Sequence, residues 1–428
     1  MVAVCFYFQV HQPFRIRKYR IFDIGVEKEY FDEKKNREIM HKVAQKCYLP
    51  MNKLLLDLIK ENKGKFKVAF SISGVAIEQM AKYYPEVLDS FVDLAKTGCV
   101  EFLSETYYHS LSFLYSREEF KEQIELHKKL IKKYFNYEPK IFRNTELVYT
   151  NELASFIEDL GYKGIFAEGW DSVLGWRSPN FLYEPLNTKG NIALFTKNYK
   201  LSDDVAFRFS NKDWAKWPLT VDKYVDWVNA INGNGEILNL FMDYETFGEH
   251  QWEDTGIFNF MRFLPKKILE HSDNSFVTPS EALEIFPKRD KLDVPFLLSW
   301  ADTERDLSAW LGNRMQQESS REMFEIESIV KELKDKELLD SWRKLTTSDH
   351  FYYMCTKYWS DGDVHKYFSA YDSPYDAYVY FMNALNDLII RIKEKQKKKG
   401  IILKKDLNLH EPLNDNKVSQ EKADNLSA

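Results

Sequence analysis

Short apolar segments alternate with amphipathic helical segments over about the first 290 residues, and this alternation limits the possible folds more than any other feature. Eight of these segments have the length of strands, and several are apolar throughout, as strands that are covered on both faces should be. We expect strands at 2–9, 66–72, 99–103, 140–143, 164–167, 192–196, 204–208 and 237–242. Because neither G-x-G-x-x-G nor G-x-x-x-x-G-K-[ST] is present, the pattern favours a parallel α/β barrel over a nucleotide-binding sheet.

Two helices in this region have clear end signals. Ser116 and Glu119 fit the S-x-x-E capping box that begins a helix, and apolar residues then recur on one helical face. A second helix is expected from about Thr150 to Leu160, with Gly161 as its C-cap.

The pattern changes after about residue 290, where strand signals fade. Helices are expected there at 303–334, 336–345 and 374–397. We therefore expect a barrel domain at 1–288, a helical subdomain at 289–397 and a polar, disordered tail at 398–428.

Composition excludes several classes of protein. With 60 basic and 66 acidic residues the net charge is −6, and the basic run at 391–400 is typical of a solvated helix end, so no nucleic-acid partner is expected. No uninterrupted apolar stretch reaches the ~18 residues that span a bilayer, so no membrane partner is expected. The apolar N-terminus lacks a basic n-region, and the four cysteines show no paired spacing, which predicts reduced thiols and a cytoplasmic location. No sequence feature sets an oligomeric state.

In a parallel barrel, residues just past the C-terminal ends of the strands face the active site. The polar residues at these predicted ends are His11, Glu101, His109, Arg143, Glu146, Asp243, Glu245 and, further along the last of these segments, His250. Glu146 and Asp243 are the strongest candidates, because each follows an apolar strand and has polar neighbours. The alternative for Glu101 is helix capping or a lysine pair, and the alternative for His11 is a bond to backbone groups of its own loop.

Two further clusters mix aromatic and polar residues. Trp300 and Asp302 lie in the segment 297–314, and Asp349 and His350 precede three aromatic residues. Sugar rings stack on tryptophan, and carboxylates accept hydrogen bonds from sugar hydroxyls, so both clusters are candidate carbohydrate-binding sites.

Such a rim suits two chemistries. One is glycoside cleavage by a pair of carboxylates, and the other is metal-assisted hydrolysis, as in a carbohydrate deacetylase. Metal-binding spacings such as H-x-x-x-H are absent, although a metal site built from His11, His109 and an aspartate remains a minor alternative. A third hypothesis is a glucan-binding protein that has lost catalysis.

Five motifs together resemble the five ordered sequence regions of glycoside hydrolase family 57. They are "VHQP" at 10–13, "GCVEFLSETYYHSL" at 98–111, "FRNTEL" at 142–147, "FMDYETFGEH" at 241–250 and "SDHFYYM" at 348–354. The chain most resembles the archaeal α-amylase-like group, whose relatives include 4-α-glucanotransferases, branching enzymes and amylopullulanases. The resemblance implies a (β/α)7 barrel followed by a helical region that completes the cleft, a retaining mechanism, and no cofactor.

The resemblance also implies roles for individual residues. Glu146 falls at the position of the nucleophile and Asp243 at that of the general acid/base. His11, Glu101, Glu245 and Asp349 match further family positions, and His250 lies where some relatives carry an aromatic residue that governs water access. The implied substrate is an α-1,4-glucan or maltooligosaccharide, which an α-amylase hydrolyses and a 4-α-glucanotransferase, the main alternative, transfers to another sugar.

Overall fold

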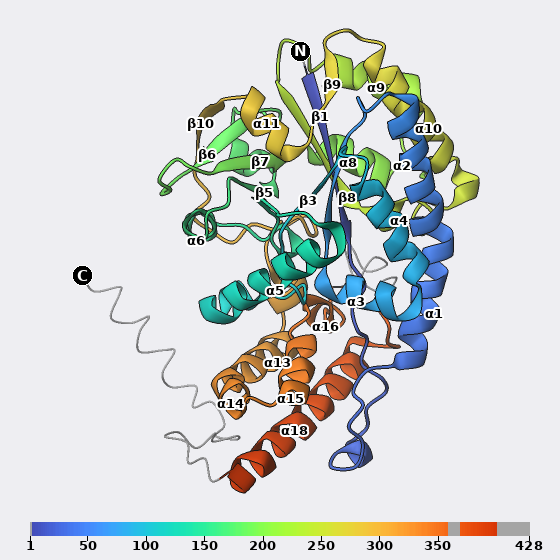
Figure 1. Cartoon of the computed structure of the whole chain (residues 1–428). Helices are drawn as coiled ribbons and strands as arrows, with labels where there is room; N and C mark the ends of the chain where they lie inside the picture. Colours follow the sequence, from blue (N-terminus) through green and yellow to red (C-terminus); the bar gives the residue numbers. More distant parts are fainter. Residues whose placement is uncertain (1, 358–368, 400–428) are drawn as a thin grey trace.

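The computed structural model describes residues 2–357 and 369–399, and its strands form two sheets (Figure 1). The first contains β1 (Val2–Val10), β2 (Val68–Ile72), β3 (Val100–Phe102), β8 (Ile237–Asp243) and β9 (Asn274–Phe276). The second contains β4 (Ile141–Phe142), β5 (Gly164–Glu168), β6 (Leu182–Pro185), β7 (Ala193–Lys197) and β10 (Lys288–Leu292). Their orders are β3–β2–β1–β8, with β9 also on β1, and β10–β6–β7–β5–β4. Only the β6–β7 pair is antiparallel among the pairs of these strands.

The two sheets contact each other at both edges of the first sheet without becoming one continuous sheet. At one edge Ser104, just past β3, forms an isolated parallel bridge with Phe142 of β4. At the other edge Asn198 N–H donates to Asn239 O at 2.9 Å, and the Asn239 amide donates to Thr196 O at 3.1 Å. The expected parallel α/β organisation is therefore confirmed, whereas a single closed sheet is not formed by the described strands.

Helices pack around the strands. They are α1 (Glu33–Val43), α2 (Leu49–Glu61), α3 (Gly74–Tyr83), α4 (Pro85–Ala95), α5 (Arg117–Phe135), α6 (Asn151–Asp159), α7 (Asp171–Leu174), α8 (Tyr199–Ala206), α9 (Val221–Asn229), α10 (Ile257–Leu269) and α11 (Pro279–Ile285). Figure 1 shows α1, α2, α4 and α10 along one side of β1 and β8. All nine residues of β1 are buried, as expected for a strand enclosed on both faces.

One predicted strand is wrong. Residues 204–208 lie mostly within α8. The helix begins because the Asn198 side chain accepts from Leu201 N–H at 3.1 Å, and Asp204 then binds Arg208 one turn later. Val205 and Ala206 therefore face the core from a helix, whereas Phe207, just past the end of that helix, is exposed. The strands β6, β9 and β10 were not predicted, and β10 in particular reads KRDKL, with only Leu292 buried.

Helices gather at the lower end of the molecule in Figure 1, next to the C-terminal end of β1. They are α12 (Ser308–Leu311), α13 (Arg314–Glu325), α14 (Glu327–Leu333), α15 (Lys336–Leu345), α16 (Ser348–Tyr352) and α18 (Pro374–Lys399). The segment 303–334 is thus broken into three helices, while 336–345 is one helix as expected. Trp310, Trp342 and Phe381 belong to their shared apolar core. Of the expected tail, residues 400–428 lie outside the described part of the chain.

A buried ion pair ties this helical layer to the strand-bearing part. Ser116 caps α5 as expected, since its hydroxyl accepts from Glu119 N–H at 3.1 Å. The Glu119 carboxylate does not complete the expected capping box, because it instead binds the Arg343 guanidinium of α15 at 2.8 and 3.0 Å. None of the described helices is long and apolar enough to cross a membrane.

Candidate active site

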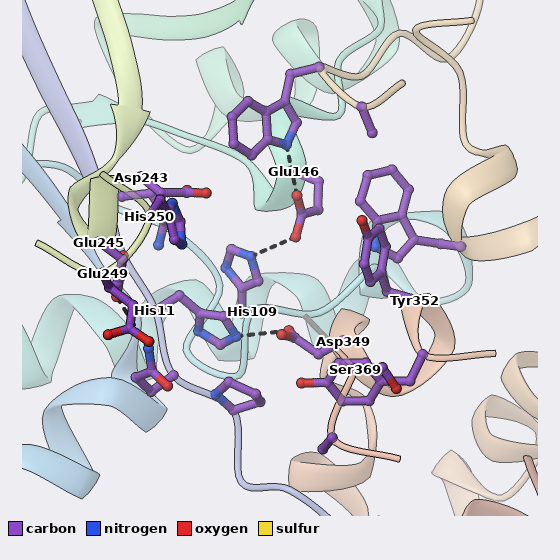
Figure 2. Close-up of a pocket in the computed structure, with 18 of the residues that line it drawn as sticks. His11, His109, Glu146, Asp243, Glu245, Glu249, His250, Asp349, Tyr352 and Ser369 are labelled. Atoms are coloured by element: carbon purple, nitrogen blue, oxygen red, sulfur yellow. Dashed lines mark hydrogen bonds and ion pairs between the residues drawn. The ribbon is translucent and has the colours of Figure 1, made fainter. Parts of the chain in front are cut away.

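A cavity of about 760 Å³ opens where the C-terminal ends of the strands meet the helical layer. Most of the residues predicted from sequence line it, and Figure 2 shows several of them pointing inward from different elements. The predicted residues in its wall are His11, His109, Arg143, Glu146, Asp243, Glu245, His250, Trp300, Asp302 and Asp349. Residues 146 and 349, which are far apart in the sequence, thereby share one site.

Glu146 occupies a constrained position just past β4. It lies in a 3₁₀ turn (Thr145–Leu147) with φ of 55°, and Leu147 has φ of 50°. Left-handed conformations of this kind cost residues other than glycine on the order of 1–3 kcal/mol each, so surrounding contacts must hold the turn. One such contact is the Asn144 side-chain amide, which donates to Val148 O at 2.9 Å.

Both oxygens of the Glu146 carboxylate have donors. Trp300 Nε1 donates to Oε2 at 2.8 Å, and His109 Nε2 lies 3.2 Å from Oε1. Burial alone raises the pKa of Glu146, but the hydrogen bond and charge of His109 and the charge of Arg143 outweigh it, and the pKa falls below its ordinary value. Glu146 therefore stays ionised, as a nucleophile requires.

Asp243 presents the opposite environment at the end of β8. Its side chain points across the cavity toward Glu146 (Figure 2). Burial and the negative charge of Glu146 raise the pKa of Asp243 to about 7, against smaller opposing effects of Arg143, His109 and Lys197. Asp243 can therefore hold a proton near neutral pH and release it, which suits a general acid/base.

Glu245 lies beside Asp243 and belongs to a second hydrogen-bonded group. The Tyr48 hydroxyl donates to Glu245 Oε1, and the Gln12 amide donates to the same oxygen at 3.3 Å. Burial, and then the charge of Asp243, raise the pKa of Glu245 to about 8. Further along the same wall His250 lines the cavity, and burial lowers its pKa to about 4, so its ring is neutral at pH 7.

His11 and His109 stack face to face, with ring centroids 4.0 Å apart. His11 Nε2 lies 2.9 Å from Asp349 Oδ2, and its Nδ1 lies 2.7 Å from Ser73 Oγ. Every ring nitrogen of the two histidines thus has a protein partner, since the two nitrogens of His109 contact glutamates. A metal site built on these histidines would have to break these contacts. No group of three or more His, Cys, Asp and Glu among residues 2–357 and 369–399 is arranged to hold a metal.

The structure does not bring two of the predicted site residues to the cavity. Glu101 does not line the cavity, because it lies within β3 and its carboxylate accepts from Ser280 N–H at 2.8 Å and Ser280 Oγ at 2.6 Å, at the start of α11. His350 is also absent from the cavity wall, since its Nε2 lies 3.2 Å from Lys344 O and its ring packs near Phe381. The helix-capping alternative for Glu101 is therefore the correct one.

Two buried residues of the site were not among the predicted site residues. Glu105 lies 3.0 Å from His109 Nδ1, and the E-x-x-x-H spacing was a signal that could have identified it. Lys197 ends β7, one residue past the predicted strand, and lies 3.2 Å from Asp203 and 3.4 Å from Glu168. Its ammonium also lies 5.1 Å from the centroid of the Trp300 ring, so this buried cluster supports the indole that donates to Glu146.

Arg143 and Asp302 complete the wall in different ways. Arg143 is fully buried with its guanidinium 5.0 Å from the Phe241 ring centroid, and its Nε and Nη1 have no hydrogen-bond partner among the described residues. Buried donors of this kind usually bind an ordered water. Asp302 lies 3.1 Å from Lys357 Nζ at the cavity edge.

Comparison with known sequences shows a family match and relatives. The profile of Glycosyl hydrolase family 57 matches residues 5–295. A Methanocaldococcus jannaschii protein named "Putative alpha-amylase" is 46% identical over 406 residues, which cover 92% of this chain and 85% of that protein. An "Alpha-amylase" of Pyrococcus abyssi is 25% identical over 218 residues, or 50% of this chain and 32% of that protein.

Solved structures share the fold. The branching enzyme of GH57 type from Pyrococcus horikoshii matches with a TM-score of 0.67 at 16% identity, covering 94% of this chain and 95% of that chain. The 4-alpha-glucanotransferase of Thermococcus litoralis matches with a TM-score of 0.65 at 17% identity, covering 93% of this chain but 60% of that chain. At these identities the likeness shows the fold alone. The profile match spans most of the chain, and the chain belongs to glycosyl hydrolase family 57.

Proposed function

We propose that the chain is a retaining glycoside hydrolase of α-1,4-glucans, of the α-amylase type, with Glu146 as nucleophile and Asp243 as general acid/base. The observation that carries this proposal is the contrast between two carboxyl groups that face one cavity. The pKa of Glu146 is lowered, while that of Asp243 is raised to about 7. Two carboxyl groups with separated pKa values are what a double displacement at a glycosidic bond requires.

The first step forms a glycosyl ester. A Glu146 oxygen attacks the anomeric carbon while the bond to the glycosidic oxygen breaks, and that oxygen keeps the bonding electrons and takes the proton of Asp243. Trp300 and His109 hold the carboxylate during the attack, through contacts of 2.8 and 3.2 Å. Orientation of this kind lowers the barrier by removing rotational freedom before the reaction.

The second step releases the sugar. Asp243, now ionised, takes a proton from water, whose oxygen attacks the anomeric carbon and frees the Glu146 carboxylate. Two inversions at one carbon return the original α configuration. No metal or cofactor takes part in either step.

The proposed substrate is an α-glucan or maltooligosaccharide. The family and the names of the relatives support this class. In the cavity, Trp300 and Tyr352 offer flat surfaces to sugar rings, and Asp302 offers oxygens to hydroxyl groups. We also propose that the two sheets are arcs of one (β/α)7 barrel within residues 1–288, and that 289–397 form a helical subdomain that completes the cleft.

The test is the product profile on maltoheptaose, with Glu146→Gln and Asp243→Asn as inactive variants and Glu101→Gln as control. We expect shorter maltooligosaccharides and new reducing ends from the wild type and from the control. Products longer than the donor, without new reducing ends, would assign a 4-α-glucanotransferase instead. Binding of maltooligosaccharide without any turnover would assign a non-catalytic glucan-binding protein.

A further inference from the structure

A carboxylate that takes no direct part in this chemistry lies behind the proposed nucleophile. Glu105 is 0% exposed, in the segment after β3. Its Oε1 accepts from Ser71 Oγ at 2.8 Å and from Gln9 Nε2 at 3.2 Å, which fixes it against β2 and β1. Its Oε2 is left for His109, whose Nδ1 lies 3.0 Å away.

His109 joins this carboxylate to the nucleophile through the two nitrogens of one ring. Its Nδ1 faces Glu105, and its Nε2 lies 3.2 Å from Glu146 Oε1. An ionised carboxylate only accepts hydrogen bonds, so each contact needs a proton on the histidine nitrogen. Both contacts are satisfied together only when His109 is doubly protonated, as a cation between two anions.

The pKa shifts agree with this charge state. Burial raises the pKa of Glu105, but the hydrogen bond and charge of His109 outweigh it and lower the pKa to about 2. Burial lowers the pKa of His109, but the hydrogen bonds to Glu105 and Glu146 outweigh it and raise the pKa to about 9. Proton transfer between the three groups is thus disfavoured near neutral pH.

Besides the two glutamates, no described residue makes a hydrogen bond to the ring of His109. His11 stacks on its ring but directs its own nitrogens to Asp349 and Ser73. Burial and the charge of His109 lower the pKa of His11, so the stacked partner is neutral. The main chain of His109 is in the left-handed region, with φ of 52°, and it is held there by its own N–H, which donates to Thr106 O at 3.1 Å, and by Ser348 N–H, which donates to His109 O at 2.9 Å.

We propose that Glu105 is a positioning residue for the nucleophile, which it serves by holding His109 as an imidazolium against Glu146. This inference rests on the proposed function, since it needs Glu146 to be the nucleophile. When the glycosyl ester forms, Glu146 loses its negative charge and its attraction for His109 weakens. Glu105 then holds the ring alone, so the carboxylate released by water meets the same donor in the same place.

The kinetic test is Glu105→Gln, with Glu101→Gln as matched control. Glu101 is a second buried glutamate, 2% exposed and four residues earlier, whose carboxylate binds Ser280 away from the cavity. We expect kcat of Glu105→Gln on maltoheptaose to fall about 10- to 100-fold with KM nearly unchanged, as for other residues that orient a catalytic group. The kcat of the control should stay near the wild-type value. Equal kcat values in the two variants would contradict the inference.

The protonation of His109 gives a second readout that needs no turnover. We expect ¹⁵N NMR at about pH 8 to show this ring doubly protonated in the wild type and neutral in Glu105→Gln, with the signal assigned by its loss in His109→Gln. Glu105→Asp, which keeps the charge, should retain the doubly protonated ring and serves if the glutamine variant does not fold. An inactive wild type would reject the proposed function. An active wild type whose Glu105→Gln variant keeps both kcat and the doubly protonated ring would reject this inference alone.

Discussion

His11 Nε2 lies 2.9 Å from Asp349 Oδ2 and thereby joins residues 338 positions apart in the chain. His11 follows β1, and Asp349 belongs to α16 of the helical layer. The contact therefore fixes one wall of the cavity against the other, and it links the stability of the fold to the shape of the site.

The unfolding free energy that is lost when this contact is removed should depend on pH in a defined way. Burial raises the pKa of Asp349, but the charge of His11, which is protonated in the acidic range where Asp349 titrates, and its hydrogen bond outweigh burial and hold the pKa of Asp349 well below its usual range. A group with a lowered folded pKa stabilises the fold fully above its unfolded pKa, about 3.9, and loses that effect as pH falls below it. We expect Asp349→Asn to lose about 1–3 kcal/mol of unfolding free energy at pH 7 and pH 5, and less at pH 3, in urea denaturation. An equal loss at all three pH values would contradict this assignment.

Replacing Asp243 should change the free energy of unfolding in the opposite direction from replacing Asp349. Its folded pKa, about 7, lies above its unfolded value, so its contribution to stability is present below about pH 4 and is lost as pH rises through 7. We expect Asp243→Asn to be more stable than the wild type at pH 8, by on the order of 1–3 kcal/mol, and of similar stability near pH 4. Thermal or urea unfolding would measure this. Asp254→Asn, at an exposed position, controls for the loss of one carboxylate and should not be more stable than the wild type at pH 8.

The two carboxyl groups should be coupled directly. The charge of Glu146 raises the pKa of Asp243, second only to burial. We expect Glu146→Gln to lower the pKa of Asp243 from about 7 toward its ordinary range, as followed by ¹³C NMR of the aspartate carboxyl groups. The signal is assigned by its absence in Asp243→Asn. A pKa of Asp243 that stays near 7 in Glu146→Gln would mean that the two groups do not share the site.

The Trp300 indole should matter through its N–H group. Its Nε1 donates to Glu146 Oε2 at 2.8 Å. Burial raises the pKa of Glu146, and His109, Arg143 and, to a smaller extent, this hydrogen bond from Trp300 lower it. We expect Trp300→Phe to lower kcat roughly 10- to 100-fold, the worth of one hydrogen bond to a charged group, and to move the acidic limb of kcat/KM to higher pH. Trp310→Phe is the control, because Trp310 also lines the cavity but its Nε1 has no hydrogen-bond partner among the described residues. We expect that variant to keep its kcat and acidic limb.

The sequence was sufficient to predict the strand ends that carry most of the cavity wall. Apolar strands bounded by polar residues placed Glu146 and Asp243 on one rim, because parallel strands bring their C-terminal ends together. The expectation that a polar residue at the end of a strand faces the site failed for Glu101. Strand β3 ends at Phe102, so Glu101 lies inside the strand and below the rim. Glu105, just beyond the strand, is the residue that reaches the site.

Other differences between the prediction and the structure have separate causes. His350 follows Asp349 on a short helix, and consecutive helical residues point about 100° apart, so only one of them faces the cavity. The contact between Trp300 and Glu146 spans 154 residues, and no local pattern reports such a contact. The segment 204–208 has the composition of a strand, and it became helical because of the cap at Asn198.

The most direct test of the two-carboxylate mechanism is the anomeric configuration of the glycosyl azide formed when azide is added to Glu146→Ala with α-glucosyl fluoride. Fluoride leaves without a proton, so this substrate needs no general acid, and azide fits the space of the missing carboxylate. If Glu146 is the nucleophile, azide attacks from its face and the product is β-glucosyl azide, whereas Asp243→Ala gives the α product through the intact ester. An α-glucosyl azide from Glu146→Ala, or no azide product from it, would contradict the assignment of Glu146 as nucleophile.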